Sequence, residues 1–110
     1  MPTFITYASY SHAGVKGMVT EPVDRTQAIK ALVEKAGGKL IAAYMTTGEH
    51  DAVLITEVPD GSDAVAAGMA AAASGAIAKV TTVRAWTLPE FKGVAEKASR
   101  LTGAYKPPGK

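Results

Sequence analysis

Apolar and polar residues alternate near the start of the chain with the period of a β-strand. Phe4–Ser9 is rich in aromatic and β-branched residues, and its side chains alternate between two faces. Two further strands are predicted at Lys39–Thr46 and Asp51–Val58, and the short turn Thr47–His50 between them makes them antiparallel. A fourth strand is predicted at Val80–Leu88. The pattern therefore predicts four strands, two of which form a hairpin.

Between the strands, apolar residues recur at the spacing of amphipathic helices. Asp24 is the predicted cap of a first helix, which ends at Gly37-Gly38 because glycine permits a left-handed residue. Ser62 is the predicted cap of a second, Ala-rich helix, and Pro89 begins a third. The buried stripe of the second helix is predicted at Val65, Gly68, Met69, Ala72 and Ala76. These small residues predict that this helix lies close to the sheet.

The segment Tyr10–Pro22 has no clear period and is longer than most connections, so it is predicted to be a loop, of the length that is often functional. On the fourth strand, one side carries Val80, Thr82, Arg84, Trp86 and Leu88. The other side carries Thr81, Val83, Ala85 and Thr87. We predict that this second side, which is small and apolar, faces the helices.

The element order, βαββαβ followed by a terminal helix, is the ferredoxin-like arrangement. We predict an α+β fold with both helices on one face of a four-stranded antiparallel sheet. Residues 1–103 form one domain and residues 104–110 a flexible tail. The residues that could make the uncovered face aromatic and amphipathic are Tyr7, Tyr44, Arg84 and Trp86. If they point that way, a second subunit or a ligand must cover them.

Composition narrows the classes of function. With 47% hydrophobic and 20% charged residues in 110, the chain is a globular domain and not a disordered one. The absence of cysteine excludes thiolate catalysis and fits a reducing compartment. A net charge of +2 with dispersed basic residues argues against nucleic acid, and no apolar run reaches the roughly 18 residues that span a bilayer. We expect a cytoplasmic protein that binds neither nucleic acid nor membrane.

Five segments resemble the GYD domain family, small bacterial and archaeal proteins of the dimeric α/β-barrel class. They are Tyr10-Ser11-His12-Ala13-Gly14, Leu32–Leu40, Gly48-Glu49-His50-Asp51, Glu57–Asp60 and Val83–Thr87. This chain has His50 where the motif has tyrosine, and Ala72–Lys79 lacks the family's usual Gly-Asn-Val ending. The resemblance implies a homodimer formed sheet to sheet, with pockets between sheet and helices. It implies no particular reaction.

The two histidines are candidates for acid–base chemistry. The Asp51 carboxylate could orient the imidazole of His50, but neighbours on a strand point to opposite faces. The alternative is that Asp51 braces the hairpin through backbone N–H groups. His12 could approach His50 and, with Glu49 or Asp51, offer nitrogen and oxygen ligands. No spacing in the sequence requires such a site, and we predict no metal and no other cofactor.

The candidate ligand-binding residues are Tyr7, Tyr44, Asp51, Arg84 and Trp86. Arg84 lies in a predicted interior strand, where an unpaired charge is costly, so it needs an anion. That anion is either a carboxylate or phosphate of a ligand, or an acid such as Glu57, Asp51 or one from a partner subunit. The aromatic residues either line a ligand pocket or form the core of a dimer.

Three functions follow from these alternatives. The first is a non-catalytic homodimer that binds a small anionic or aromatic molecule between Tyr10–Pro22 and the sheet. The second is a cofactor-free enzyme with His50 or His12 as the base and Arg84 holding the substrate anion. The third is a purely structural or oligomerising role.

Overall fold

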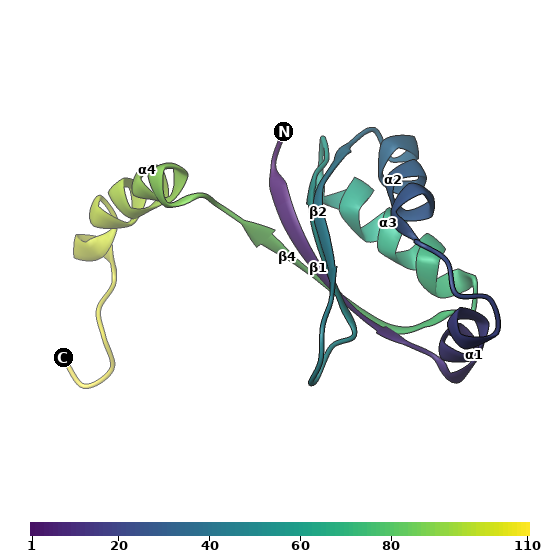
Figure 1. Ribbon diagram of the computed structural model, residues 1–110. Coiled ribbons are helices and arrows are strands. Elements are labelled where there is room, and N and C mark those ends of the chain that lie inside the picture. The colour runs from purple at the N-terminus through teal and green to yellow at the C-terminus, as the bar shows by residue number, and fades with distance from the viewer.

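The computed structural model of the protein describes all 110 residues and contains one four-stranded sheet (Figure 1). Its strands are β1 (Thr3–Tyr10), β2 (Lys39–Met45), β3 (Ala52–Glu57) and β4 (Ile77–Ala85). They lie in the order β2-β3-β1-β4, and every neighbouring pair is antiparallel. The predicted α+β, ferredoxin-like fold is confirmed.

Four α-helices accompany the sheet. α2 (Thr26–Lys35) and α3 (Gly61–Ala73) cover one face, and α1 (His12–Thr20) lies where β1 ends and β4 begins (Figure 1). α4 (Leu88–Ser99) lies on the opposite side of the sheet and is held away from it, and a 3₁₀ turn over Thr102–Ala104 follows (Figure 1). The predicted terminal helix is therefore present, but it does not pack on the body of its own chain.

Helix α1 occupies the segment that the sequence predicts to be a loop, so that prediction is wrong. The Ser11 hydroxyl caps the helix by accepting a hydrogen bond from the Gly14 N–H at 3.1 Å. The Ser11 N–H in turn donates to the Ala76 carbonyl oxygen at 2.9 Å, just before β4. The helix has only nine residues and contains two glycines, which weaken its helical pattern. Contacts with the start of β4, rather than intrinsic propensity, position it.

Short polar side chains also fix the starts of α2 and α3. The Asp24 carboxylate accepts hydrogen bonds from the hydroxyl and the N–H of Thr26, and these bonds lower the pKa of Asp24. Asp60, and not the predicted Ser62, caps α3, and the hydroxyl and N–H of Ser62 likewise lower the pKa of Asp60. Gly37 ends α2 with a φ of +87°, as predicted.

The core between the helices and the sheet is small. Phe4 of β1 packs with Val33 of α2 and Ala64 of α3, together with Val58, and Leu40 packs against this cluster. Only eight of the 110 residues are buried, and most of them have small side chains. A core of this kind does not fill the space beneath two helices.

Two predictions of which side chains face inward are wrong, the first of them in part, because Gly68 of the predicted α3 stripe does face the sheet. On α3, Val65 and Met69 are 51% and 67% exposed, and the smaller Ala64 is buried instead. On β4, a Cβ atom built on Gly68 would lie 3.0 Å from Val80 Cγ1, so the Val80 side of the strand faces the helices. Both differences have the same cause. α3 presents alanine and glycine to the sheet, and these small residues leave room for the larger side chains of β4.

The opposite face of the sheet has no cover within the chain. Because Phe4 and Ala8 face the helices, the alternating Ile5 and Tyr7 point to the other side. The strand register places further apolar side chains beside them, so that the central residues of this bare face are Ile5, Tyr7, Tyr44, Val53, Ile55 and Val83. Tyr44 is 62% exposed and Val83 is 41% exposed. The predicted bare face is present, and Tyr7 and Tyr44 lie on it.

Candidate functional site

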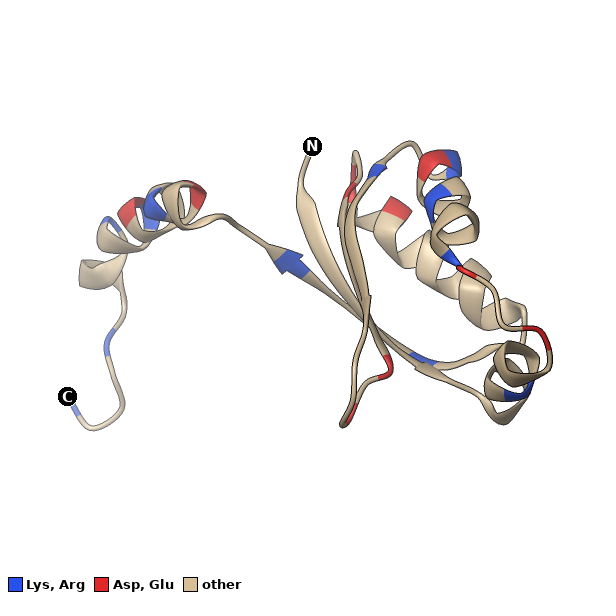
Figure 2. Cartoon of the chain, in the orientation of Figure 1, with Lys and Arg blue, Asp and Glu red and all other residues tan.

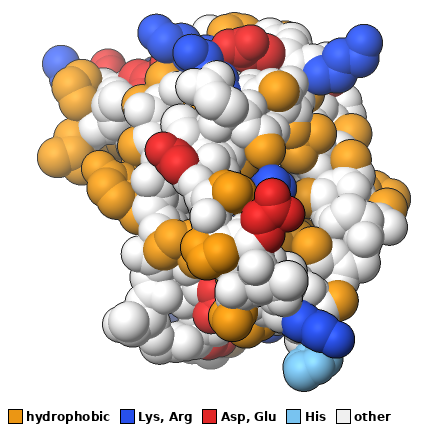
Figure 3. Space-filling model, turned by 45° about the vertical axis from the view of Figure 1, so that its right-hand side comes forward, with side chains coloured by type: hydrophobic (Ala, Val, Ile, Leu, Met, Phe, Trp, Pro, Cys, Tyr) orange, Lys and Arg blue, Asp and Glu red, His pale blue; other side chains and the backbone are white.

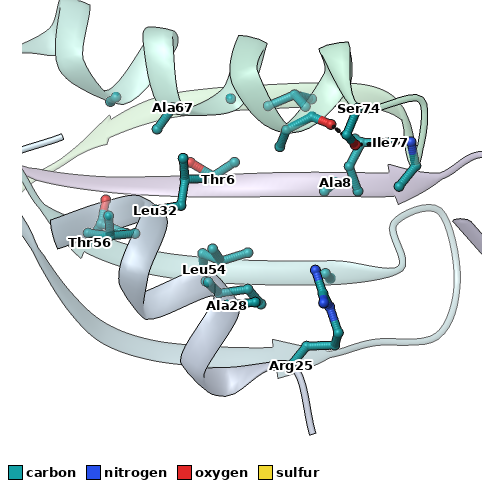
Figure 4. Close-up of a pocket in the computed structure, with 18 of the residues that line it drawn as sticks. Thr6, Ala8, Arg25, Ala28, Leu32, Leu54, Thr56, Ala67, Ser74 and Ile77 are labelled. Atoms are coloured by element: carbon teal, nitrogen blue, oxygen red, sulfur yellow. Dashed lines mark hydrogen bonds between the residues drawn. The ribbon is translucent and has the colours of Figure 1, made fainter. Parts of the chain in front are cut away.

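A cavity of about 270 Å³ lies between the sheet and helices α2 and α3. Its floor is formed by side chains of β1 and β3, including Thr6, Ala8 and Leu54 (Figure 4). One wall comes from α2, with Ala28 and Leu32, and the facing wall comes from the alanines and Gly68 of α3. Fifteen of the twenty lining residues are hydrophobic, so the cavity favours an apolar occupant.

Small side chains create this space. Ala28, Ala67 and Ala71 stand where larger core residues would meet, and Ala8 and Ala52 lie beneath them. Because the lining is largely apolar and the space is unfilled, apolar side chains here lack the packing partners that a filled core would give them. A ligand that fills the cavity would supply those contacts and so stabilise the fold.

The entrance to the cavity carries one basic group. The Arg25 side chain extends from the N-terminal end of α2 toward the strands (Figure 4). A more open groove along α1, lined by Gly14 and Gly17, shares Tyr10, Arg25 and Ala76 with the cavity. The two hollows therefore meet beside a guanidinium, which binds carboxylate and phosphate groups well. Around them, Figure 3 shows acidic and basic side chains interspersed among hydrophobic ones.

None of the predicted site residues lines this cavity. Tyr7 lies on the bare face, where its ring centroid is 4.8 Å from that of His50. Tyr44 lies on the same face, because its register partner Val53 is also the partner of Tyr7. These three aromatic side chains therefore belong to the uncovered side of the sheet.

Arg84 lies on the other side. Its guanidinium is 5.8 Å from the centroid of the buried Phe4 ring and 4.4 Å from that of Trp86. It donates hydrogen bonds to the carbonyl oxygens of Thr3, at 3.2 Å, and of Ala85. Backbone carbonyls and aromatic faces thus surround the cation, and not one of the acids of the chain that the sequence offered as partners. The prediction that Arg84 lies in an interior strand is wrong, because β4 is an edge strand of the sheet. Arg84 does not share the bare face with Tyr7, nor a pocket with His50.

The carboxylate of Asp51 is engaged with the backbone. Its Oδ2 accepts a hydrogen bond from the Tyr10 N–H at 2.8 Å, while the Asp51 N–H donates to Ala8. The bracing role of Asp51 is therefore confirmed, although it ties the hairpin to β1 rather than closing the turn. His12 is exposed at the start of α1. No group of three histidine, aspartate or glutamate side chains is arranged to hold a metal ion.

The family resemblance implied pockets between sheet and helices, but sequence reasoning identified neither the residues that line this cavity nor Arg25. The signal that could have found them is the concentration of small residues in two facing elements, the alanine-rich α3 and the strand positions of Ala8 and Ala52. The alanines of α3 favour a helix, and their small side chains also leave the core incompletely filled. Arg25 follows Asp24 at the start of α2, where a charged residue is ordinary, so nothing in the sequence singles it out.

No helix combines the length and the apolar character that a membrane crossing requires. The family model described as "GYD domain" matches residues 4–95. A comparison with curated proteins finds no match.

Two solved structures resemble the chain in fold. The crystal structure of FFRP-DM1 is 16% identical with a TM-score of 0.54, and the match covers 78% of this chain and 100% of that one. The crystal structure of TTHA0845 from Thermus thermophilus is 16% identical with a TM-score of 0.50, covering 79% of this chain and 95% of that one. At this identity the likeness shows the fold alone. About a fifth of this chain has no counterpart in either structure.

Proposed function

The chain belongs to the GYD domain family, and because a fold does not name a function, we propose one from its own cavity. The protein binds a small apolar or aromatic molecule that carries one anionic group. The apolar part occupies the cavity between the sheet and helices α2 and α3, and the anion lies against Arg25. The observation that carries this proposal is the largely apolar cavity of about 270 Å³ with a guanidinium at its entrance.

The size of the cavity sets the size of the ligand. A protein cavity of about 150 Å³ accepts benzene, so about 270 Å³ accommodates a substituted ring or a medium-length alkyl chain. The Thr6 and Thr82 hydroxyls are 3.4 Å apart and can hydrogen-bond each other, so they do not require a hydrogen bond from a ligand. Specificity therefore rests on shape and on the charge at Arg25.

We also propose that two copies associate through the bare face. Its apolar centre, which includes Ile5, Ile55 and Val83, lies on strands whose other face already packs against helices. A second copy is the occupant that the homodimer implied by the family resemblance would supply. Tyr7, Tyr44 and His50 then become interface residues rather than ligand-binding or catalytic ones.

No specific observation favours the enzyme alternative. His50 stacks on Tyr7 on the bare face, whereas Arg84 lies beside Phe4 on the helix-covered face. His50 and Arg84, on opposite faces of one sheet, cannot act on one substrate within a single chain. His12, the other candidate base, is exposed at the start of α1. We therefore propose binding and assign no reaction.

A ligand panel tests the proposal directly. Phenylacetate and octanoate are the anionic probes, and phenylacetamide and octanol are their neutral counterparts. At about 100 times its dissociation constant, a bound anion raises the free energy of unfolding by about 2.7 kcal/mol, which is measured as an increase in melting temperature. The neutral probes should bind more weakly. If none of the four shifts the melting temperature or gives heat in calorimetry, the proposal is wrong.

Two matched pairs of variants locate the site. Ala67→Leu fills the cavity, so it should abolish binding and raise the free energy of unfolding by about 2 kcal/mol. Ala66→Leu, at the exposed position beside it, should do neither. Arg25→Gln should remove the preference for anionic over neutral probes, whereas Arg100→Gln, at the end of α4, should preserve it. Equal binding by Ala67→Leu and Ala66→Leu would place the ligand elsewhere.

A further inference from the structure

The C-terminal segment Trp86–Lys110, called the arm below, extends away from the body of its own chain (Figure 1). The Cα radius of gyration is 17.7 Å, whereas a compact chain of this length has a radius of about 13 Å. The molecule measures 60 Å along its longest axis and 32 Å along the next. This elongation comes from the arm, in which α4 is held away from the body and the contact of Trp86 with Arg84 lies at its start (Figure 1).

The arm contains a well-specified amphipathic helix. Thr87 and Glu90 form a capping box at the start of α4, and Pro89 lies in its first turn. The apolar residues fall on one side of the helix and are Leu88, Phe91, Val94, Ala95, Ala98 and Leu101. Leu88 is 89% exposed, Leu101 is 65% exposed and Phe91 is 47% exposed. An isolated helix of twelve residues is only marginally stable in water, so this stripe needs a surface to pack on.

The arm lies on the same side of the sheet as the bare face. α1, α2 and α3 lie on one side of the sheet and α4 lies on the other (Figure 1). The start of the arm is fixed, because the Trp86 ring packs against Arg84 and meets the Phe91 ring edge to face at 6.0 Å. A second copy seated on the bare face would lie on the side of the sheet to which the arm extends, and the arm of that copy would extend toward the first (Figure 1).

Charge favours contact between arm and body over contact between two arms. The arm carries five basic and two acidic side chains, whereas residues 1–85 carry seven basic and eight acidic ones (Figure 2). Pairing two arms would bring like charges together, and placing an arm on the body of the other copy would not. Charge thus favours placing an arm on a body over pairing it with a second arm.

We propose that the two copies of a dimer exchange arms, each α4 laying its Leu88–Phe91–Leu101 stripe on the body of the other copy beside the bare face. The interaction is reciprocal, as twofold symmetry requires. The inference rests on the sheet-to-sheet dimer proposed above, and it adds a second contact to that dimer. It is independent of the ligand cavity.

The first test compares two variants that introduce the same side chain on opposite sides of α4. Phe91→Glu places a carboxylate in the apolar stripe. Gly93→Glu places one on the polar side, where a Cβ atom meets nothing within 4 Å. By analytical ultracentrifugation the dissociation constant of the dimer should rise at least about tenfold in Phe91→Glu and stay unchanged in Gly93→Glu.

Hydrogen exchange of the α4 amides gives a second readout on the same proteins. The wild type and Gly93→Glu should show protected amides over residues 91–99 when dimeric, and Phe91→Glu should lose that protection. A dimer that is equally tight in all three proteins, with α4 unprotected, would leave the sheet interface standing and overturn the arm exchange. A wild type that is monomeric at all concentrations would overturn both.

Isotope mixing distinguishes exchange from docking of the arm on its own chain. The chain is prepared with ¹⁴N and with ¹⁵N, the two are mixed and re-equilibrated, and lysines are cross-linked. Lys92 and Lys97 of the arm should link to Lys39 or Lys79 of the body in pairs that carry both labels. Links in same-label pairs only would show that the arm folds back. Protection of α4 only when phosphatidylglycerol vesicles are added would show that it binds a membrane surface. Either result would overturn the proposal.

Discussion

The position of α1 depends on the absence of a side chain at Gly14. This residue is buried, and a Cβ atom built on it would overlap the carbonyl oxygen of Ala76. The same carbonyl oxygen accepts the hydrogen bond from the Ser11 N–H. Gly17 lies on the same helix, and a Cβ atom on it would meet nothing within 4 Å. One of these glycines allows a close approach between two segments, and the other has no such role.

The two glycines should therefore respond in opposite ways to alanine. Gly14→Ala should lower the free energy of unfolding by about 1–3 kcal/mol, because α1 must move away from Ala76. Gly17→Ala should raise it by roughly 0.5–1 kcal/mol through helix propensity alone. Urea denaturation followed by circular dichroism measures both changes. A loss of stability in Gly17→Ala comparable to that in Gly14→Ala would show that α1 tolerates no side chain on either side.

Among the elements, α4 has the most complete capping signal and lies furthest from the rest of the chain (Figure 1). Glu90 accepts a hydrogen bond from the Thr87 N–H at 2.8 Å, and the Thr87 hydroxyl accepts one from the Glu90 N–H at 3.2 Å. Hydrogen bonds from the Thr87 backbone and then its side chain lower the pKa of Glu90 below its ordinary value of 4.5. The start of α4 is thus stabilised by a carboxylate that must be ionised.

The helix content of α4 should accordingly depend on pH. A carboxyl group whose pKa is lower in the folded state contributes stability above its ordinary pKa and loses it as the pH falls through the folded value. The NMR chemical shifts of residues 88–99 should therefore report full helix at neutral pH and fraying below about pH 4. Glu90→Gln should flatten this dependence. Glu96→Gln removes a carboxylate that lies outside the capping box, so it should leave the dependence intact; a flat profile in the wild type would contradict the prediction.

The elements also show what sequence pattern can and cannot predict. Strands and helix ends with a local signal, such as the β2–β3 hairpin and the end of α2 at Gly37, follow from the sequence alone. α1 does not, because a nine-residue helix with two glycines is positioned by the carbonyl of Ala76, which is distant in sequence. The inward side of α3 is equally hard to predict because nearly every residue in it is apolar. Its largest side chains, Val65 and Met69, are the natural choice for a core, and they point outward.

At the scale of the whole molecule, the family resemblance implied a pocket between sheet and helices, but its lining could not be predicted because the site consists of missing volume. Ala8, Ala28 and Ala71 are ordinary residues in their own elements, and a cavity arises only when the fold brings them together. The candidates chosen from the sequence carry conspicuous chemistry, yet Arg84 binds backbone carbonyls and Asp51 braces a hairpin. Charged residues such as Arg84 and Asp51 thus stabilise the fold, whereas small residues line the cavity in which we expect a ligand.

The proposed sheet-to-sheet dimer and the proposed exchange of arms together predict the size of the molecule in solution. A single chain with an extended arm has a Cα radius of gyration of 17.7 Å, and a compact dimer of twice the length has one of about 17 Å. Small-angle X-ray scattering of the full chain should therefore give a radius near 17 Å, while the forward scattering intensity reports twice the mass of one chain. The arms must be folded into the assembly for both results to hold. A doubled mass with a clearly larger radius would mean that the copies associate through their sheets while the arms stay free in solvent.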